Sequence, residues 1–360
     1  MIPGLPIVRS PLSRLLLFRA DASVSIGTGH VMRCLALAQA WQDAGGRAAF
    51  AMAESTPAVH EKLRAEGFEV LSVAARAGSD EDSAQTISLA REQRAEWVVV
   101  DGYQFDADFQ RVLKTAELRV LFLDDNGHAG IYSADLVLNQ NVHAAESMYE
   151  RRGPDTRLLL GTSYSLFRRE FAAWTEWRRE IPAMGRKLLV TFGGSDPGNF
   201  TAIVMQSLRQ VKIPAMETVV VIGASNPHFA LLENIRSAIE GAVRLERNVS
   251  DMAKLMAWAD LAVSAAGTTS LEMCLLGLPA IVVTVAENQR ASARELEKRN
   301  CVVRLDASQG LRVEGVAELI EQLLRDRQTR QLLSQHGREL VDGNGAKRVI
   351  AAIEEASLLG

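Results

Sequence analysis

The chain has 360 residues, of which 48% are hydrophobic and 23% are charged, and its formal net charge is −4. This length and composition are typical of a globular protein with two domains. The weak negative charge argues against nucleic acid or an anionic membrane as a partner, and no apolar run reaches the roughly 20 residues that a transmembrane segment needs.

The start of the chain and its cysteines show no targeting signal, disulfide set or metal motif. Residues 1–13 contain three prolines and match no motif that we can assign. The apolar run 15–18 is too short for the core of a signal peptide, and Arg19 follows it directly. The cysteines are isolated, at Cys34, Cys274 and Cys301. We therefore expect a cytoplasmic monomer without a metal or a cofactor.

Strand-like and helix-like segments alternate through the first half of the chain. Short runs of β-branched and apolar residues predict strands at 15–18, 47–51, 68–73, 97–100, 119–123 and 136–138. Between them, helical patterns predict helices at 31–44, 59–66 and 83–94. This alternation favours a parallel sheet that is covered by helices on both faces.

The same alternation restarts after a break. Residues 171–185 contain tryptophans, charges and a proline, which indicates a connector between domains. Beyond it we expect strands at 187–192, 218–222, 261–264 and 280–285. The expected helices are 199–210, 230–238, 252–259, 270–276 and one that ends near residue 299. The fold class is therefore α/β, with two Rossmann-like domains, 14–170 and 186–340, facing each other across a cleft, and a final helix within 341–360 that packs back on the first domain.

A glycine turn joins the first predicted strand to the first predicted helix and delivers a histidine. Gly27 and Gly29 let the backbone approach a ligand at the start of a helix. His30 follows directly and has the side chain that titrates nearest neutral pH. It could cap the helix or satisfy a core hydrogen bond, but its place at the strand ends favours a general base. Met32 occupies the position of the third small residue of a dinucleotide fingerprint, which argues against NAD.

Polar side chains follow three other strands of the first half, at Asp101, Tyr103, Asp124, Asp125, Asn139, Gln140 and Asn141. The carboxylates could hold sugar hydroxyls or orient the ring of His30. Alternatively, Asp125 only begins a turn, since Asn and Gly follow it. The amide side chains suit sugar hydroxyl or acetamido groups.

Two glycine loops in the second half indicate a phosphate site. Residues 193–195 and 267–269 each end a strand and open a helix, where backbone N–H groups and the helix dipole bind phosphate oxygens. Together they could hold a diphosphate without metal. Glu272 lies on the first turn after the second loop, where it could accept hydrogen bonds from both ribose hydroxyls or only complement the helix dipole.

Taken together, these motifs resemble the UDP-sugar hydrolases of pseudaminic acid biosynthesis. The resemblance runs from about residue 14 to the end and rests on the segments 19–21, 27–33, 100–103, 138–141, 160–169, 192–196, 265–272, 287–289 and 342–346. It implies a GT-B fold, like that of the lipid II-forming N-acetylglucosamine transferase. It also implies a reaction in which water attacks the anomeric carbon of UDP-2,4-diacetamido-2,4,6-trideoxy-β-L-altropyranose and releases UDP.

The resemblance also implies roles for single residues. His30 would activate the water, Glu272 would hold the ribose, and the first and second domains would hold the sugar and UDP respectively. The diphosphate would lie on Gly194, Ser195, Gly267, Thr268 and Thr269. The remaining expected substrate contacts are Gly27, Gly29, Arg33, Asp101, Tyr103, Asn139, Gln140, Asn141, Asp196, Asn288 and Gln289. The alternatives are a glycosyltransferase in which His30 activates an acceptor hydroxyl, a binding module without turnover, and an epimerase.

Overall fold

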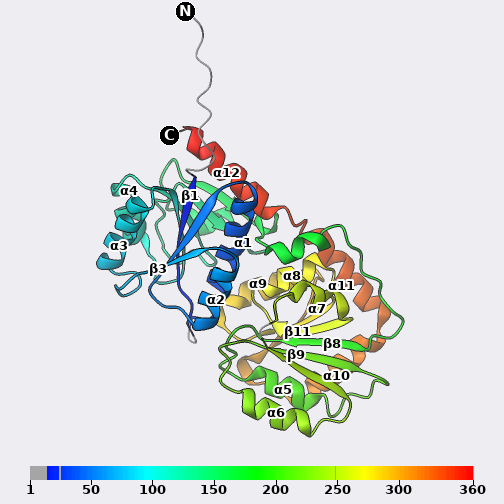
Figure 1. The fold of residues 1–360 in the computed structure, drawn as a ribbon. Coiled ribbons are helices and arrows are strands. Elements are labelled where there is room, and N and C mark those ends of the chain that lie inside the picture. Colours follow the sequence, from blue (N-terminus) through cyan, green and yellow to red (C-terminus); the bar gives the residue numbers. More distant parts are fainter. Residues whose placement is uncertain (1–13, 24–25, 248, 360) are drawn as a thin grey trace, which may run out of the picture.

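The computed structural model describes residues 14–23, 26–247 and 249–359, and the unassigned residues 1–13 lie outside these ranges. The chain forms two lobes, each built around one parallel sheet with helices on both faces (Figure 1). The first lobe contains the blue to bluish-green elements and the red helix at the end of the chain, and the second lobe contains the green to orange elements.

The first lobe has a seven-stranded sheet in the order β3-β2-β1-β4-β5-β6-β7. Its strands are β1 (Leu15–Ala20), β2 (Arg47–Met52), β3 (Glu69–Ser72), β4 (Ala95–Asp101), β5 (Arg119–Leu123), β6 (Leu136–Asn139) and β7 (Arg157–Leu160). Its helices are α1 (Gly29–Asp43), α2 (Pro57–Ala65), α3 (Asp80–Glu92) and α4 (Ala107–Thr115). All six residues of β1 are buried because helices cover both faces of the sheet. The strand order reverses between β1 and β4, which makes the loops after these strands the natural ligand site.

The second lobe has the same kind of arrangement, with a six-stranded sheet in the order β10-β9-β8-β11-β12-β13. Its strands are β8 (Lys187–Thr191), β9 (Glu217–Ile222), β10 (Ala242–Arg247), β11 (Leu261–Ala265), β12 (Ala280–Thr284) and β13 (Val303–Asp306). Its helices are α5 (Phe200–Ser207), α6 (Phe229–Ser237), α7 (Met252–Trp258), α8 (Thr269–Leu275), α9 (Arg290–Lys298), α10 (Val313–Arg325) and α11 (Arg327–Leu340). The order reverses between β8 and β11, so the two glycine loops of the sequence analysis lie side by side.

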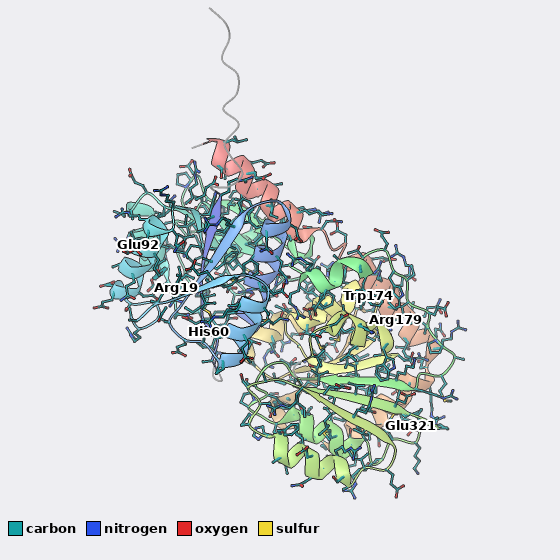
Figure 2. The ribbon with its side chains drawn as sticks, in the orientation of Figure 1. Arg19, His60, Glu92, Trp174, Arg179 and Glu321 are labelled. Atoms are coloured by element: carbon teal, nitrogen blue, oxygen red, sulfur yellow. The ribbon has the colours of Figure 1, made fainter. Side chains whose placement is uncertain are left out.

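The chain crosses between the lobes twice. The first crossing contains the short helix η4 (Arg169–Trp174), and Arg179 anchors it by donating hydrogen bonds to carbonyls at the end of α7. Figure 2 labels Trp174 and Arg179, which lie close to each other at the second lobe. The second crossing follows α11 and leads into α12 (Gly345–Leu359).

Helix α12 packs on the first lobe, beside α1 (Figure 1). Its side chains Val349 and Ile353 belong to the same buried cluster as Phe18 of β1. The Trp97 Nε1 donates a hydrogen bond to the Ser357 Oγ at 2.9 Å. The last residues of the chain therefore complete the core of the first lobe.

Several strands and helices have no clear pattern in the sequence and are not among the predicted elements. The missed strands are β7, β10 and β13, which are the outermost strands of their sheets on three of the four edges. Strand β10 contains Arg244 and Glu246, and no residue of β13 is fully buried, so these strands lack a continuous apolar run. The missed helices α4, α10 and α11 interleave apolar and charged residues.

Candidate active site

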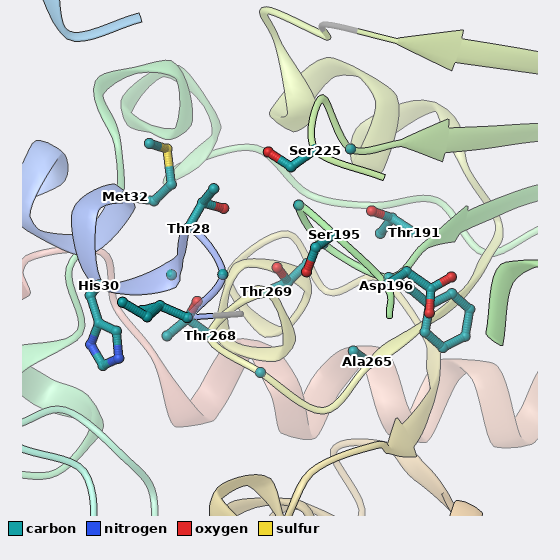
Figure 3. Close-up of a pocket in the computed structure, with 18 of the residues that line it drawn as sticks. Thr28, His30, Met32, Thr191, Ser195, Asp196, Ser225, Ala265, Thr268 and Thr269 are labelled. Atoms are coloured by element: carbon teal, nitrogen blue, oxygen red, sulfur yellow. The ribbon is translucent and has the colours of Figure 1, made fainter. Parts of the chain in front are cut away.

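A cleft of about 1370 Å³ lies between the lobes and is lined by residues from both. The first lobe contributes the start of α1 and one face of α2, and the second lobe contributes the loops that follow β8, β11 and β12. Figure 3 shows Thr28 and His30 of the first lobe across from Ser195 and Thr269 of the second. The cleft therefore lies at the carboxyl ends of both sheets, where the strand orders reverse.

The glycine turns of the two lobes touch each other across this cleft. A Cβ added at Gly194 would lie 2.9 Å from the Oγ1 of Thr28 in the other lobe. Within the second lobe, a Cβ added at Gly223 would lie 2.2 Å from the carbonyl oxygen of Gly194. Gly27 and Gly193 adopt φ angles of +80° and +77°, which suit glycine. These positions need glycine because the backbones approach closely and turn sharply.

His30 is held by a buried ion pair beneath it. Its Nδ1 lies 2.7 Å from the Oδ1 of Asp101, which is fully buried at the end of β4. Arg33 lies one turn further along α1 and donates to both carboxylate oxygens of Asp101 at 2.6 Å. Burial alone would raise the pKa of Asp101, but Arg33 and His30 outweigh it and hold this pKa well below its ordinary range.

The ionised carboxylate determines which nitrogen of His30 acts as a base. Asp101 can only accept hydrogen bonds, so the proton of a neutral His30 lies on Nδ1. The lone pair is then on Nε2, and His30 lines the cleft. This arrangement of carboxylate and imidazole is suited to general base catalysis.

A tyrosine connects the two lobes close to His30. The hydroxyl of Tyr103 donates to the Oδ2 of Asp125 at 2.9 Å and accepts from the Nδ2 of Asn288 at 2.9 Å. Its ring meets the ring of His30 edge-on, with 5.0 Å between the centroids. Burial and the charge of Asp125 raise the pKa of Tyr103, so the phenol stays protonated at neutral pH.

Most of the residues expected from the sequence line this cleft. They are Gly27, Gly29, His30, Arg33, Tyr103, Asn141, Gly194, Ser195, Asp196, Gly267, Thr268, Thr269, Glu272, Asn288 and Gln289. They come from loops that are far apart in the sequence and follow strands of both sheets.

Three expected substrate contacts do not face the cleft. Asp101 is fully buried and its carboxylate is already bound by Arg33 and His30. Asn139 is also fully buried, where it donates to the hydroxyl of Tyr149 at 2.8 Å. Gln140 accepts from the backbone N–H of Leu166 at 2.7 Å. A direct contact between these side chains and a sugar does not fit this geometry, because packing within the first lobe uses them.

Asp196 lies at the cleft but also supports its wall. Its Oδ1 accepts from the N–H of Phe200 and its Oδ2 from the N–H of Thr201, each at 2.9 Å. The carboxylate therefore secures the start of α5, and Asp196 itself has a φ of +43°. Ser195 precedes Asp196 and supplies the hydroxyl group with which this loop lines the cleft.

Glu272 is tied to the first crossing between the lobes. Its Oε1 accepts from the Nη2 of Arg168 at 3.1 Å, and the Nη1 of Arg168 lies 3.2 Å from Glu170. Burial would lower the pKa of Arg168, but both glutamates outweigh it and raise this pKa. No motif in the sequence pointed to a separate role for Arg168, or for the face of α2 between Thr56 and Glu66 that lines the cleft.

Asp125 and Ser292 were also missed as site residues. Asp125 was considered as a carboxylate that could hold sugar hydroxyls or orient His30, or as part of a turn, but it was not among the expected substrate contacts. It lines the cleft and accepts from Arg33, Tyr103 and Asn141. Its place at the end of β5 was the signal in the sequence. Ser292 on α9 donates to Asn141, and no motif in the sequence marked it.

Two features are absent from the residues that the structure describes. Within these residues, His, Cys, Asp and Glu side chains form no group of three that could hold a metal ion. No helix in the described part of the chain is long and apolar enough to cross a membrane.

Comparison with known sequences places the chain in a family. The model of the Glycosyltransferase family 28 C-terminal domain matches residues 188–351. The spore coat polysaccharide biosynthesis protein SpsG of Bacillus subtilis is 30% identical over 239 residues, which cover 66% of this chain and 69% of that protein. The UDP-2,4-diacetamido-2,4,6-trideoxy-beta-L-altropyranose hydrolase of Campylobacter jejuni is 26% identical over 285 residues, 79% of this chain and 96% of that protein. The chain belongs to the family of these two proteins.

This membership confirms the resemblance seen in the motifs. The match to another relative, protein MJ1062 of Methanocaldococcus jannaschii, is 26% identical and covers 75% of this chain but only 55% of that protein. Among solved structures, MurG of Acinetobacter baumannii superposes with a TM-score of 0.66 at 16% identity, covering 95% of this chain and 99% of MurG. The expected GT-B fold is thereby confirmed.

Proposed function

We propose that this protein is a UDP-sugar hydrolase in which His30 activates a water molecule for attack on the anomeric carbon. The observation that carries the proposal is the His30–Asp101 pair, which faces two glycine loops across one cleft. A base on one lobe and a phosphate-binding surface on the other suit displacement of a nucleoside diphosphate.

The second lobe would bind the UDP. Backbone N–H groups of the loops after β8 and β11 would hold the diphosphate, together with the hydroxyls of Ser195 and Thr269. Glu272 would accept hydrogen bonds from the ribose hydroxyls. Preformed donors of this kind stabilise the negative charge that develops on a departing phosphate.

The first lobe would deliver the nucleophile. His30 Nε2 accepts a proton from water as the water oxygen bonds to C1 of the sugar, and the bond between C1 and the phosphate oxygen breaks with its electron pair leaving on UDP. The water would attack C1 from the side of the first lobe, and the phosphate oxygen would leave toward the second lobe. The reaction would therefore invert the configuration at the anomeric carbon. Tyr103 and Asn288 would contact the sugar or leaving-group oxygens beside His30.

A relative supports the proposed substrate class. The C. jejuni protein is named for a UDP-diacetamido-trideoxy-altropyranose, and this chain shares 26% identity with it over 79% of its length. We propose the same class of UDP-activated diacetamido sugar here, as a step toward a nonulosonic (pseudaminic) acid, in the cytoplasm.

One observation favours a second candidate, a GT-B glycosyltransferase of surface polysaccharide synthesis. The cleft includes a face of α2 that hydrolysis does not use, and a sugar acceptor could lie there. In that reaction His30 would take its proton from an acceptor hydroxyl instead of water.

An isotope experiment separates these reactions. The protein is incubated with UDP-2,4-diacetamido-2,4,6-trideoxy-β-L-altropyranose in H₂¹⁸O with a chelator and followed by ³¹P and ¹H NMR and mass spectrometry. A hydrolase of this mechanism releases UDP and a free sugar with ¹⁸O at C1. Label in the UDP would contradict attack at C1, and a bound but intact substrate would favour the transferase.

A further inference from the structure

Three side chains of the site donate hydrogen bonds to the carboxylate of Asp125. Its carboxylate accepts from the Nη1 of Arg33 at 2.5 Å, from the Nδ2 of Asn141 at 2.7 Å and from the hydroxyl of Tyr103 at 2.9 Å. The donors come from α1 and from the loops after β6 and β4, and Asp125 itself follows β5. One carboxylate therefore joins the ends of several strands of the first lobe.

Two of these donors also bind the second lobe. Tyr103 accepts from Asn288, and the Oδ1 of Asn141 accepts from the Oγ of Ser292 at 3.2 Å. Asn288 and Ser292 lie four residues apart around the start of α9. These contacts between the lobes exist only while the lobes are together.

The third donor leads to the proposed base. Arg33 is shared between Asp125 and Asp101, and Asp101 fixes the ring of His30. Arg33 is almost completely buried, so its two carboxylate partners determine its position. A shift of Asp125 therefore moves the guanidinium that holds Asp101.

We propose that Asp125 is a positioning residue that couples closure of the cleft to the orientation of His30. This inference rests on the proposed function. With the lobes together, Asn288 and Ser292 hold Tyr103 and Asn141, and these two side chains fix both oxygens of Asp125. With the lobes apart, Asp125 loses this support, and the Arg33–Asp101–His30 arrangement is no longer held in its active geometry. Water is then activated only in the closed cleft.

The first test compares Asp125→Asn with wild-type protein. The amide nitrogen cannot accept from Tyr103 as Oδ2 does, and the neutral side chain loses the charge that strengthens the bond from Arg33 to Oδ1. We therefore expect kcat to fall about 100-fold, the order of loss that a misplaced catalytic group causes. The Kd for UDP, measured by calorimetry, should change less than about twofold because UDP binds the other lobe. Asp135→Asn is the matched control, since Asp135 pairs with Lys114 away from the cleft and its loss should leave kcat unchanged. An unchanged kcat in Asp125→Asn would overturn the proposal.

A double-mutant cycle tests the coupling itself. Ser292→Ala should lower kcat in wild-type protein but have little further effect in Asp125→Asn, because the link is already broken. Additive effects would show that Asp125 acts only on local structure. If Asp125→Asn fails to fold, the same cycle between Asn141→Ala and Ser292→Ala tests the link from Asn141 to Ser292.

A spectroscopic measurement keeps the proposal separate from the hydrolase assignment. Long-range ¹H–¹⁵N correlation spectra report the proton position on His30 with and without UDP. The proposal predicts that UDP shifts the His30 signals in wild-type protein and that Asp125→Asn abolishes this response. An equal response in both proteins overturns the coupling. Wild-type protein that shows the response but no turnover contradicts only the proposed hydrolysis.

Discussion

His30 illustrates how a single residue gains a function from partners that are remote in sequence. Asp101 is 71 positions away along the chain, yet its carboxylate holds Nδ1 at 2.7 Å. Arg33 donates to both carboxylate oxygens, so Asp101 stays ionised and cannot donate a proton. The imidazole therefore presents one fixed nitrogen as a base.

The first prediction removes this base. His30→Asn should lower turnover about 1,000-fold, within the range that general base catalysis contributes, while the Kd for UDP stays within about twofold. Turnover is measured by ³¹P NMR and binding by calorimetry. Retention of full activity in this variant would falsify the assignment of His30 as the base.

A second histidine, His128, is not among the residues that line the cleft, and we expect it to affect stability. The Nε2 of His128 lies 3.0 Å from the carbonyl oxygen of Phe105, and its Nδ1 lies 3.4 Å from the Oδ2 of Asp124. The Nδ1 makes no hydrogen bond in this geometry, but it lies close enough to Asp124 for an ion pair when the ring is protonated. Burial lowers the pKa of His128, but Asp124 and the Phe105 carbonyl outweigh it and raise this pKa.

The second prediction follows from this shift. A pKa that is higher in the folded than in the unfolded protein gives stability that is complete below the unfolded pKa of about 6.5 and is lost as pH rises through the folded pKa. The free energy of unfolding of wild-type protein should exceed that of His128→Asn by more at pH 6 than at pH 9. Denaturant unfolding at both pH values measures this, and a difference that does not depend on pH would contradict it.

Among the elements, helix α8 carries the residue expected to bind ribose. Glu272 lies in its first turn and is paired with Arg168. Because one hydrogen bond contributes about 0.5–1.5 kcal/mol, Glu272→Ala should raise the Kd for UDP about tenfold if two contacts to the ribose are lost. Calorimetry measures this, and Glu170→Gln is the control because it removes the other partner of Arg168 but leaves Glu272 in place. Equal effects of both variants would assign the loss to Arg168.

Helix α12 supports the first lobe through its apolar face. Ile353→Ala should lower the free energy of unfolding by about 3 kcal/mol, as is usual for a buried isoleucine that leaves a cavity. Leu358→Ala on the same helix removes an 87% exposed side chain and should change it by less than about 0.5 kcal/mol. Thermal and denaturant unfolding of both variants test whether α12 is part of the core or only a terminal appendage.

The sequence predicts the central strands of each sheet better than the strands at the sheet edges. Buried parallel strands such as β1 and β4 are continuous apolar runs, so their positions can be read directly. Strands β10 and β13 at the sheet edges are half exposed, and their mixed residues match no strand pattern.

The candidate site likewise contains residues that the sequence predicts and residues that it does not. The glycine turns and His30 are local motifs, which a linear sequence displays. The roles of Asp101 and Asp125 depend on Arg33, which lies 68 and 92 positions away. The side-chain directions of Asn139 and Asn141 could not be predicted either, because β6 ends at Asn139 and strand alternation stops there.

For the whole molecule, the close contact between the glycine turns limits how far the cleft can shut. Gly194→Ala should hold the lobes apart, because the new Cβ would lie 2.9 Å from the Oγ1 of Thr28. We expect kcat to fall by about tenfold or more, with a larger radius of gyration by X-ray scattering in the presence of UDP. Thr28→Ala removes the clashing atoms and should restore much of the activity in the double variant. A double variant as slow as Gly194→Ala would show that the defect lies within the loop itself.

The two crossings of the chain have a mechanical consequence. They touch each other, since the Oγ1 of Thr162 donates to the carbonyl oxygen of Leu340 at 2.8 Å and a Cβ at Gly343 would lie 2.6 Å from Thr175. A pair of adjacent covalent links resists twist and translation of one lobe against the other far more than a single flexible link does. We therefore expect the lobes to open by rotation about an axis near the two crossings, with the side of the cleft that is remote from the crossings opening most.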